Sequence, residues 1–130
     1  MSVIDHLGVQ VADYQRALRF YRSALAPLGI SIVMQVTKEE TGSYEGAGLG
    51  RDGKPDFWLS AGKHTATPLH IAFVADSRTA VDRFFEAALA AGGVDNGAPG
   101  IRAHYHPNYY GAFVLDPEGH NIEAVCHKPE

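Results

Sequence analysis

The stretch HLGVQVADYQRALRFYRSALAPLG at residues 6–29 decides the fold, because a second version, HIAFVADSRTAVDRFFEAALAAGG, occurs at residues 70–93. One constant shift carries His6 onto His70 and superimposes the closing glycines as well as the aromatic residues between them. Shared helical periodicity would align the aromatic residues, but not a histidine and a glycine at the same offset. We therefore interpret the chain as an internal repeat of two copies, which is too few for a solenoid.

Each copy reads as a strand followed by a helix. Residues 4–11 and 69–74 alternate between bulky apolar residues and other residues, as strands with one covered face do. His6 and His70 fall on the face opposite the bulky residues, where a cleft can form. An apolar stripe at helical spacing follows each strand, and we interpret its aromatic side chains as core that packs on the sheet.

Three shorter extended stretches follow each helix, giving the order βαβββ–βαβββ. They span residues 31–37, 43–50 and 56–61 in the first copy and residues 94–102, 109–116 and 121–127 in the second. We predict an α+β fold of two tandem βαβββ modules, with curved mixed sheets around a central cleft and one helix packed on each sheet. The chain is expected to be a single domain, residues 1–130, with module one at about 1–64 and module two at about 65–130.

Charge and cysteine content restrict the partners and the compartment. The formal net charge of −4 gives no basic surface, which argues against nucleic acid and membrane as partners. A single cysteine permits no internal disulfide, and the N-terminal residues do not resemble a signal peptide, so a cytoplasmic protein is expected. Seven histidines favour a metal held through imidazole and carboxylate rather than through thiolate.

The final strand contains a carboxylate among apolar residues. Glu123 shares a face with Asn121 and Val125, and a buried carboxylate requires a partner such as a hydrogen-bond donor or a cation. Together with His6 and His70 it makes a site of two imidazoles and one carboxylate with open positions for water or substrate. We predict one divalent metal ion, Fe, Mn, Ni, Co or Zn, and the sequence does not choose among them.

Four segments carry a resemblance to a known superfamily: DHLGVQVAD with His6, ALRFYRSALAPLG, PLHIAFVAD with His70, and FVLDPEGHNIEAV with Glu123. Over essentially its whole length the chain resembles the vicinal oxygen chelate superfamily, which includes glyoxalase I, fosfomycin-resistance thiol transferases, bleomycin-binding proteins and extradiol dioxygenases. The resemblance implies that these two histidines and the glutamate are metal ligands. It also implies a homodimer, because relatives of this size pair their modules across chains.

The chain departs from the glyoxalase I pattern at one position. Glyoxalase I usually has a fourth ligand in the last strand of the first module, whereas a shift of 64 positions from Glu123 leads here to Leu59, with Trp58 beside it. Three ligands fit the fosfomycin-type transferases and the dioxygenases better. However, the dioxygenases generally carry twice as many modules, and the cation-binding loop of the fosfomycin proteins is not found here.

A segment rich in histidine and tyrosine precedes the penultimate strand. One interpretation is a polar loop that packs its rings on the surface. The other is a cleft wall in which Arg102 binds a substrate carboxylate, while His104, Tyr105 or His106 supplies hydrogen bonds or moves protons. We predict that Glu123, His104 and Tyr105 are catalytic and that Arg102 and His106 bind substrate.

Four further residues have expectations of their own. Trp58 is expected at the fourth-ligand position as an apolar cleft wall, with ordinary core as the alternative, and Gln10 shares the face of His6 and can touch substrate. His120 follows a tight turn and is expected to be exposed. Cys126 is expected to be a buried strand residue rather than a nucleophile.

The resemblance and the three ligands favour a metal-dependent, glyoxalase-like enzyme of the lyase or isomerase type. Its partner would be a small vicinally oxygenated substrate, either free or presented as a thiol conjugate. The alternatives are a non-haem-iron dioxygenase, a fosfomycin-type thiol transferase, or a non-catalytic binding protein like the bleomycin-binding relatives. A purely structural metal site is a further alternative, with a fourth ligand from His64, His104 or a partner chain.

Overall fold

The computed structural model describes residues 4–64 and 67–130, so the predicted junction between the modules falls partly on residues outside this range. The first half contains two helices, a short 3₁₀ turn and four strands: β1 (Leu7–Val11), α1 (Tyr14–Leu25), η1 (Ala26–Leu28), β2 (Ser31–Val36), α2 (Lys38–Thr41), β3 (Gly46–Arg51) and β4 (Lys54–Ala61). The second half contains β5 (His70–Val74), α3 (Arg78–Ala90), β6 (Val94–Ile101), β7 (Tyr110–Leu115) and β8 (Asn121–Cys126).

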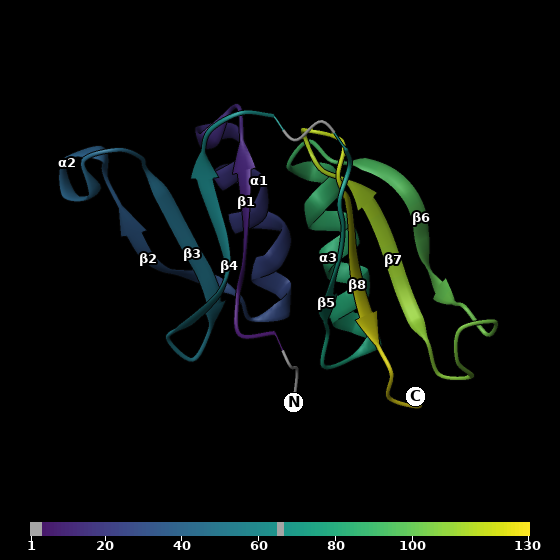
Figure 1. The fold of residues 1–130 in the computed structure, drawn as a ribbon. Coiled ribbons are helices and arrows are strands. Elements are labelled where there is room, and N and C mark those ends of the chain that lie inside the picture. The colour runs from purple at the N-terminus through teal and green to yellow at the C-terminus, as the bar shows by residue number, and fades with distance from the viewer. Residues whose placement is uncertain (1–3, 65–66) are drawn as a thin grey trace.

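The strands form two four-stranded mixed sheets, ordered β1-β4-β3-β2 and β5-β8-β7-β6 (Figure 1). In each sheet the first and last strands of the module pair in parallel, and the remaining neighbours are antiparallel. The predicted fold class is confirmed. The one-turn helix α2 was not predicted, and a capping box between Thr37 and Glu40 accounts for its formation.

The two long helices begin where the sequence provides side-chain caps. Asp13 accepts a hydrogen bond from the backbone of Arg16, and Ser77 caps α3 in the same way at Ala80. The aromatic stripes are core, as expected, and Phe20, Tyr21 and Phe84 are almost completely buried. Within the described residues, neither these helices nor any other combines the length and apolarity that crossing a bilayer would require.

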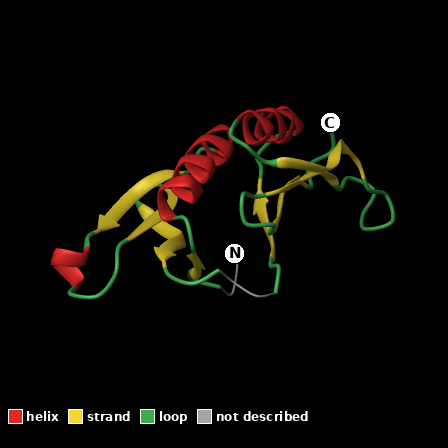
Figure 2. Cartoon of the chain, turned by 90° about the horizontal axis from the view of Figure 1, so that it is seen from above, coloured by secondary structure: helices red, strands yellow, loops and turns green. Residues whose placement is uncertain are grey.

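The helices lie in the angle between the two sheets. α1 packs against α3, and Phe57 of the first sheet contacts Phe73 of the second with ring centroids 5.3 Å apart. Seen from above, the two long helices lie side by side, and one sheet extends to either side of them (Figure 2). The faces that no helix covers therefore point away from each other.

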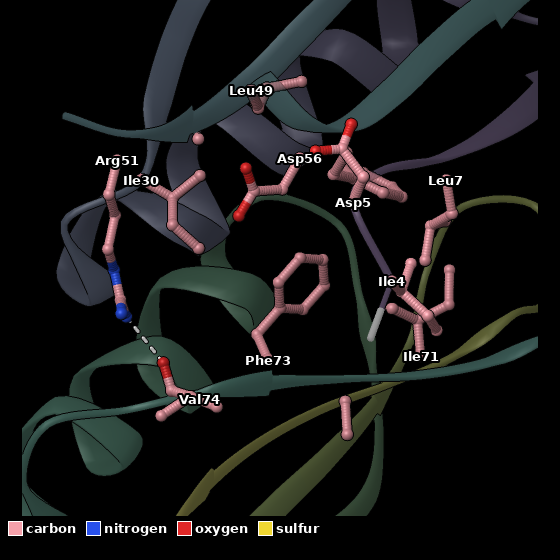
Figure 3. A pocket seen from close by; sticks show the side chains of 13 residues that line it. Ile4, Asp5, Leu7, Ile30, Leu49, Arg51, Asp56, Ile71, Phe73 and Val74 are labelled. Carbon is pink, nitrogen blue, oxygen red and sulfur yellow. Dashed lines mark hydrogen bonds between the residues drawn. The ribbon is translucent and has the colours of Figure 1, made fainter. Parts of the chain in front are cut away.

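A cavity of about 310 Å³ lies in the seam between the two halves (Figure 3). Its lining is mainly apolar, and Phe73 and Leu7 contribute from opposite sides of the seam. The Arg51 guanidinium joins the halves at its edge, because it donates to the carbonyl of Leu28 at 2.8 Å and to that of Val74 at 2.6 Å. Of the described residues that line this cavity, none is a predicted site residue.

The turn between β7 and β8 connects the two halves at another point of the seam, through contacts with α1 and the residue before it. The Tyr21 hydroxyl of α1 donates to the Asp116 carboxylate, and Glu118 accepts from the backbone of Asp13 at 3.0 Å. The expectation that His120 is exposed is wrong, since its exposed fraction is 1%. The turn packs against the rest of the fold, and Nδ1 of His120 accepts a hydrogen bond from the backbone N–H of Leu69, with 2.9 Å between the two nitrogens.

Candidate metal and substrate site

The second sheet buries Glu123 on its uncovered face. Glu123 pairs in register with Ala72 of β5, and its exposed fraction is 1% although no helix lies over it. One carboxylate oxygen lies 2.8 Å from Nε2 of His70, and the Tyr109 hydroxyl donates to the other. Two residues that the sequence predicts as metal ligands are therefore neighbours here, and a tyrosine fixes the carboxylate from the side.

Tyr109 keeps its proton in this arrangement. Burial, followed by the hydrogen bond to Glu123, raises the pKa of Tyr109 well above its ordinary value. At neutral pH its hydroxyl is a donor, and it leaves the second carboxylate oxygen of Glu123 facing the imidazole of His70. A carboxylate held in this way is preorganised to accept a cation or a proton.

A hollow of about 440 Å³ opens above this pair, a size typical of small-molecule sites. Aromatic and imidazole rings make most of its wall. The residues that line it are His70, Tyr105, His106, Tyr109, Phe113, Glu123 and His127. The rings contact one another in sequence, so they form a continuous surface rather than isolated side chains.

The first sheet has a separate hollow of about 620 Å³ on its own uncovered face, and His6 stands at its edge. Nδ1 of His6 lies 2.7 Å from the Asp5 carboxylate. Hydrogen bonds from His6 and from Lys54 lower the pKa of Asp5. The carboxylate orients the ring and leaves Nε2 as the nitrogen available to a ligand.

One copy of the chain does not bring the three predicted ligands together. Within residues 4–64 and 67–130, no group of three histidine, cysteine, aspartate or glutamate side chains is placed to share an ion. His70 and Glu123 adjoin, whereas His6 belongs to the sheet whose uncovered face points the other way (Figure 2). The residue types nevertheless suit a first-row divalent metal: a buried carboxylate beside one imidazole, and a second, oriented imidazole at the hollow of the other sheet.

Trp58 is the structural counterpart of Glu123. In the second sheet Glu123 pairs with Ala72, and in the first sheet Trp58 pairs with Gly8, the residue 64 positions before Ala72. The repeat is thus offset by 65 positions in the last strand, so the fourth-ligand position corresponds to Trp58 and not to Leu59, which is fully buried in the core. The indole lies in the first hollow at the place where a fourth ligand would stand.

Gly48 makes room for this indole. A Cβ built on Gly48 would approach two ring atoms of Trp58 to 2.9 Å and Cβ of Pro55 to 2.7 Å, well inside van der Waals contact. A glycine under the ring is therefore required by the packing of the tryptophan. The first hollow has an aromatic floor as a consequence.

The remaining predicted residues are distributed around the two hollows. Tyr105 and His106 line the second hollow, and His104 lies behind Tyr105 with ring centroids 4.1 Å apart. Gln10 is exposed beside the first hollow. Arg102 donates to the carbonyls of Ala98 and Gly100, each at 2.8 Å, so its guanidinium braces β6.

The sequence analysis missed Tyr109 and His127, which the structure adds to the second hollow. His127 follows Glu123 by four positions, so strand alternation alone places the two on one face. No comparable signal exists for Tyr109, because the bond between its hydroxyl and Glu123 depends on the path of the loop before β7. Cys126 is buried, as expected.

Two tandem βαβββ modules, each a four-stranded mixed sheet with a helix packed on it, define the class of fold. The chain belongs to the Glyoxalase/Bleomycin resistance protein/Dioxygenase superfamily, whose family model matches residues 3–124. No curated protein matches it.

Solved structures share the fold at low sequence identity. A glyoxalase/bleomycin resistance protein from Albidiferax ferrireducens T118 is 24% identical with a TM-score of 0.72, and covers 98% of this chain and 100% of its own. A glyoxalase/bleomycin resistance protein/dioxygenase family enzyme from Burkholderia phytofirmans PsJN is 22% identical, with a TM-score of 0.69 and coverages of 98% and 100%. The E144Q mutant of glyoxalase I from Zea mays is 21% identical with a TM-score of 0.71, and the match covers 94% of this chain and 46% of the maize chain.

Proposed function

We propose that this protein is a glyoxalase-like metalloenzyme of the lyase or isomerase type, which chelates a small vicinally oxygenated substrate on one divalent ion. The observation that carries the proposal is Glu123, a carboxylate that is 1% exposed and has His70 and Tyr109 as its side-chain partners. A buried carboxylate is costly unless it is hydrogen-bonded or bound to a cation, and the two partners of Glu123 hold its oxygens in one orientation at the base of the hollow, where a cation can approach them.

His6, His70 and Glu123 would hold the ion. When bound, it supplies a Lewis acid that lowers the pKa of coordinated oxygens and stabilises developing negative charge. Tyr109 keeps the carboxylate in one orientation through its hydroxyl. Glu123 is also suited to move a proton, and Tyr105, supported by His104, adjoins the same hollow.

We further propose that the site is assembled from two copies of the chain. The hollow with His6 and the hollow with His70 and Glu123 point away from each other in one copy, so a homodimer in which each copy contributes one hollow would complete the ligand set. Trp58, Gln10 and His106 would then contact the substrate. A cytoplasmic location accompanies this proposal, because the single cysteine is buried as a free thiol.

The metal is tested by elemental mass spectrometry on untagged protein after reconstitution with Mn, Fe, Co, Ni or Zn. We expect about one ion per chain in the wild type, and a large loss in Glu123→Gln, which keeps the shape of the side chain and removes its charge. A wild type that binds none of these metals would overturn the proposal. Turnover of hemithioacetals, epoxides and aromatic diols then separates the lyase from the transferase and dioxygenase alternatives.

Mixing two defective variants tests assembly from two copies. His6→Ala and Glu123→Gln each spoil every site alone, but a mixed dimer contains one intact site. After unfolding and refolding together at equal amounts, about a quarter of the wild-type metal content per chain should return. If metal content does not rise above that of either variant while mixed dimers form, the ligands do not come from two copies.

A further inference from the structure

The second hollow has a wall made of rings. Tyr105 and Tyr109 have ring centroids 5.0 Å apart, Tyr109 and His127 are 5.2 Å apart, and His127 and His106 are 5.9 Å apart. Tyr105 has an exposed fraction of 62% although it is a large aromatic residue. Its ring contacts His104 on one side and adjoins the hollow, so a flat ligand can contact it from within.

The opposite hollow also carries rings. Tyr44 and Trp58 line the hollow of the first sheet together with His6. In the two-copy arrangement proposed above, these rings would lie across the site from Tyr105 and Tyr109. Both walls of the site would therefore offer aromatic faces, which favour ligands with a flat π system.

Two permanent cations near the hollows, Arg102 and Lys54, already have partners. Arg102 donates to two backbone carbonyls and lies over the Phe113 ring at 5.4 Å. Lys54 donates to the Asp5 carbonyl at 2.6 Å and lies 3.2 Å from the carboxylates of Asp5 and Asp56. A ligand with several free carboxylates, such as a glutathione conjugate, would find Glu123 at the base of the hollow and no uncommitted guanidinium or ammonium among these residues to bind it.

We infer that the ligand of this site is a neutral molecule with a flat aromatic or heteroaromatic ring, rather than an aliphatic compound or a peptide thiol conjugate. The inference rests on the proposed function for the two vicinal oxygens that would reach the metal. The ring preference itself rests on the tyrosine and histidine wall alone. The inference therefore predicts that part of the affinity for the aromatic ligand persists without metal.

Three probes separate these features: 2,3-dihydroxynaphthalene, trans-1,2-cyclohexanediol and S-hexylglutathione. The first two share vicinal oxygens and differ in the flat ring, and the third carries the carboxylates. By calorimetric titration of the wild-type protein, we expect the naphthalenediol to bind at least about tenfold more tightly than either other probe. Tyr105→Leu should weaken the naphthalenediol by roughly tenfold, and Tyr105→Phe, which keeps the ring, should not.

The outcomes for ring recognition and for metal binding are distinct. If the protein takes up no metal, but Tyr105→Leu abolishes its binding of the naphthalenediol, the ring site is supported and the proposed metalloenzyme is overturned. Metal uptake together with equal binding of the two diols, or tighter binding of S-hexylglutathione, overturns the ring site and leaves the metalloenzyme standing. Equal unfolding temperatures of the Leu and Phe variants exclude a folding defect, as expected for an exposed side chain.

Discussion

Replacing Tyr21 by phenylalanine should destabilise the seam between the two halves by a predictable amount. The lost group is a buried hydroxyl that donates to the buried Asp116 carboxylate, and hydrogen bonds to charged groups contribute about 1.5–3 kcal/mol. The ring keeps its contacts with Phe20 and Phe57, at 5.0 and 5.1 Å between centroids, so no cavity adds to the loss. We therefore expect about 2–3 kcal/mol.

This loss corresponds to a clear shift in melting temperature. Unfolding entropy near 60 °C is about 2.1 cal/mol/K per residue, so for 130 residues the midpoint should fall by about 7–11 °C. Burial and the charge of Asp116 raise the pKa of Tyr21 well above its usual value, so the hydroxyl stays protonated and the loss should not vary between about pH 6 and 9.

Urea denaturation followed by circular dichroism measures this change, with Tyr105→Phe as the matched control at an exposed position. The control should stay within about 0.5 kcal/mol of the wild type. A double-mutant cycle with Asp116→Asn isolates the pair, and its coupling should exceed about 1 kcal/mol. Additive effects of the two substitutions would refute the view that this bond fastens the seam.

Three other predictions concern the edges of the fold and the site. The hydrogen bond to Asp82 at 2.6 Å, and then burial, raise the pKa of Tyr110 to about 12. Because an unfolded tyrosine titrates near pH 10, the stabilisation from this hydrogen bond is complete below that pH and is lost towards pH 12. The difference in urea midpoint between wild type and Tyr110→Phe should therefore shrink over this range. A constant difference would contradict the prediction. Trp58→Glu should tighten metal binding by roughly tenfold or more, if a fourth ligand is restored at the counterpart of Glu123, and a metal titration with unchanged affinity would count against this register. Gly119→Ala should cost about 1 kcal/mol in thermal unfolding, because Gly119 has φ 91°, whereas Gly8→Ala, whose added Cβ would lie 3.8 Å from Trp58, should change stability little.

Local pattern in the sequence was sufficient for the fold and for the strand faces of two candidate ligands. The repeated histidine and the period-two alternation around Glu123 predicted which strand faces carry His70 and Glu123, and the structure brings these two side chains within hydrogen-bonding distance. Alternation specifies a face of one strand, but it contains no information on how two sheets are oriented. The separation of His6 from the other two therefore could not be predicted, because it depends on helix packing between the halves.

The errors have the same physical origin. His120 was expected to be exposed because it follows a tight turn. Its burial accompanies two contacts between residues distant in sequence, the bond from Tyr21 to Asp116 of the same turn and the bond from the Leu69 backbone to His120 itself. A constant offset of 64 positions leads from Glu123 to Leu59, whereas the strand pairing selects its neighbour Trp58, which was also expected at the fourth-ligand position. A repeat detected in a helix gives a reliable alignment of residues within that helix, because helical spacing is fixed. The alignment is less reliable for strands that follow bulges and loops of different length.

The outer edge strand of the second sheet shows where this chain tolerates a change of length. Strand β6 has eight residues against six in β2, and its pairing with β7 shifts register twice. Bulges accommodate the additional length of this strand, and β8 directs Glu123 to the hollow and Ile122 to the core. An insertion of one residue inside β8 would exchange the faces of Glu123 and Ile122. A peptide tag or reporter group should therefore be inserted in β6, the outer edge strand.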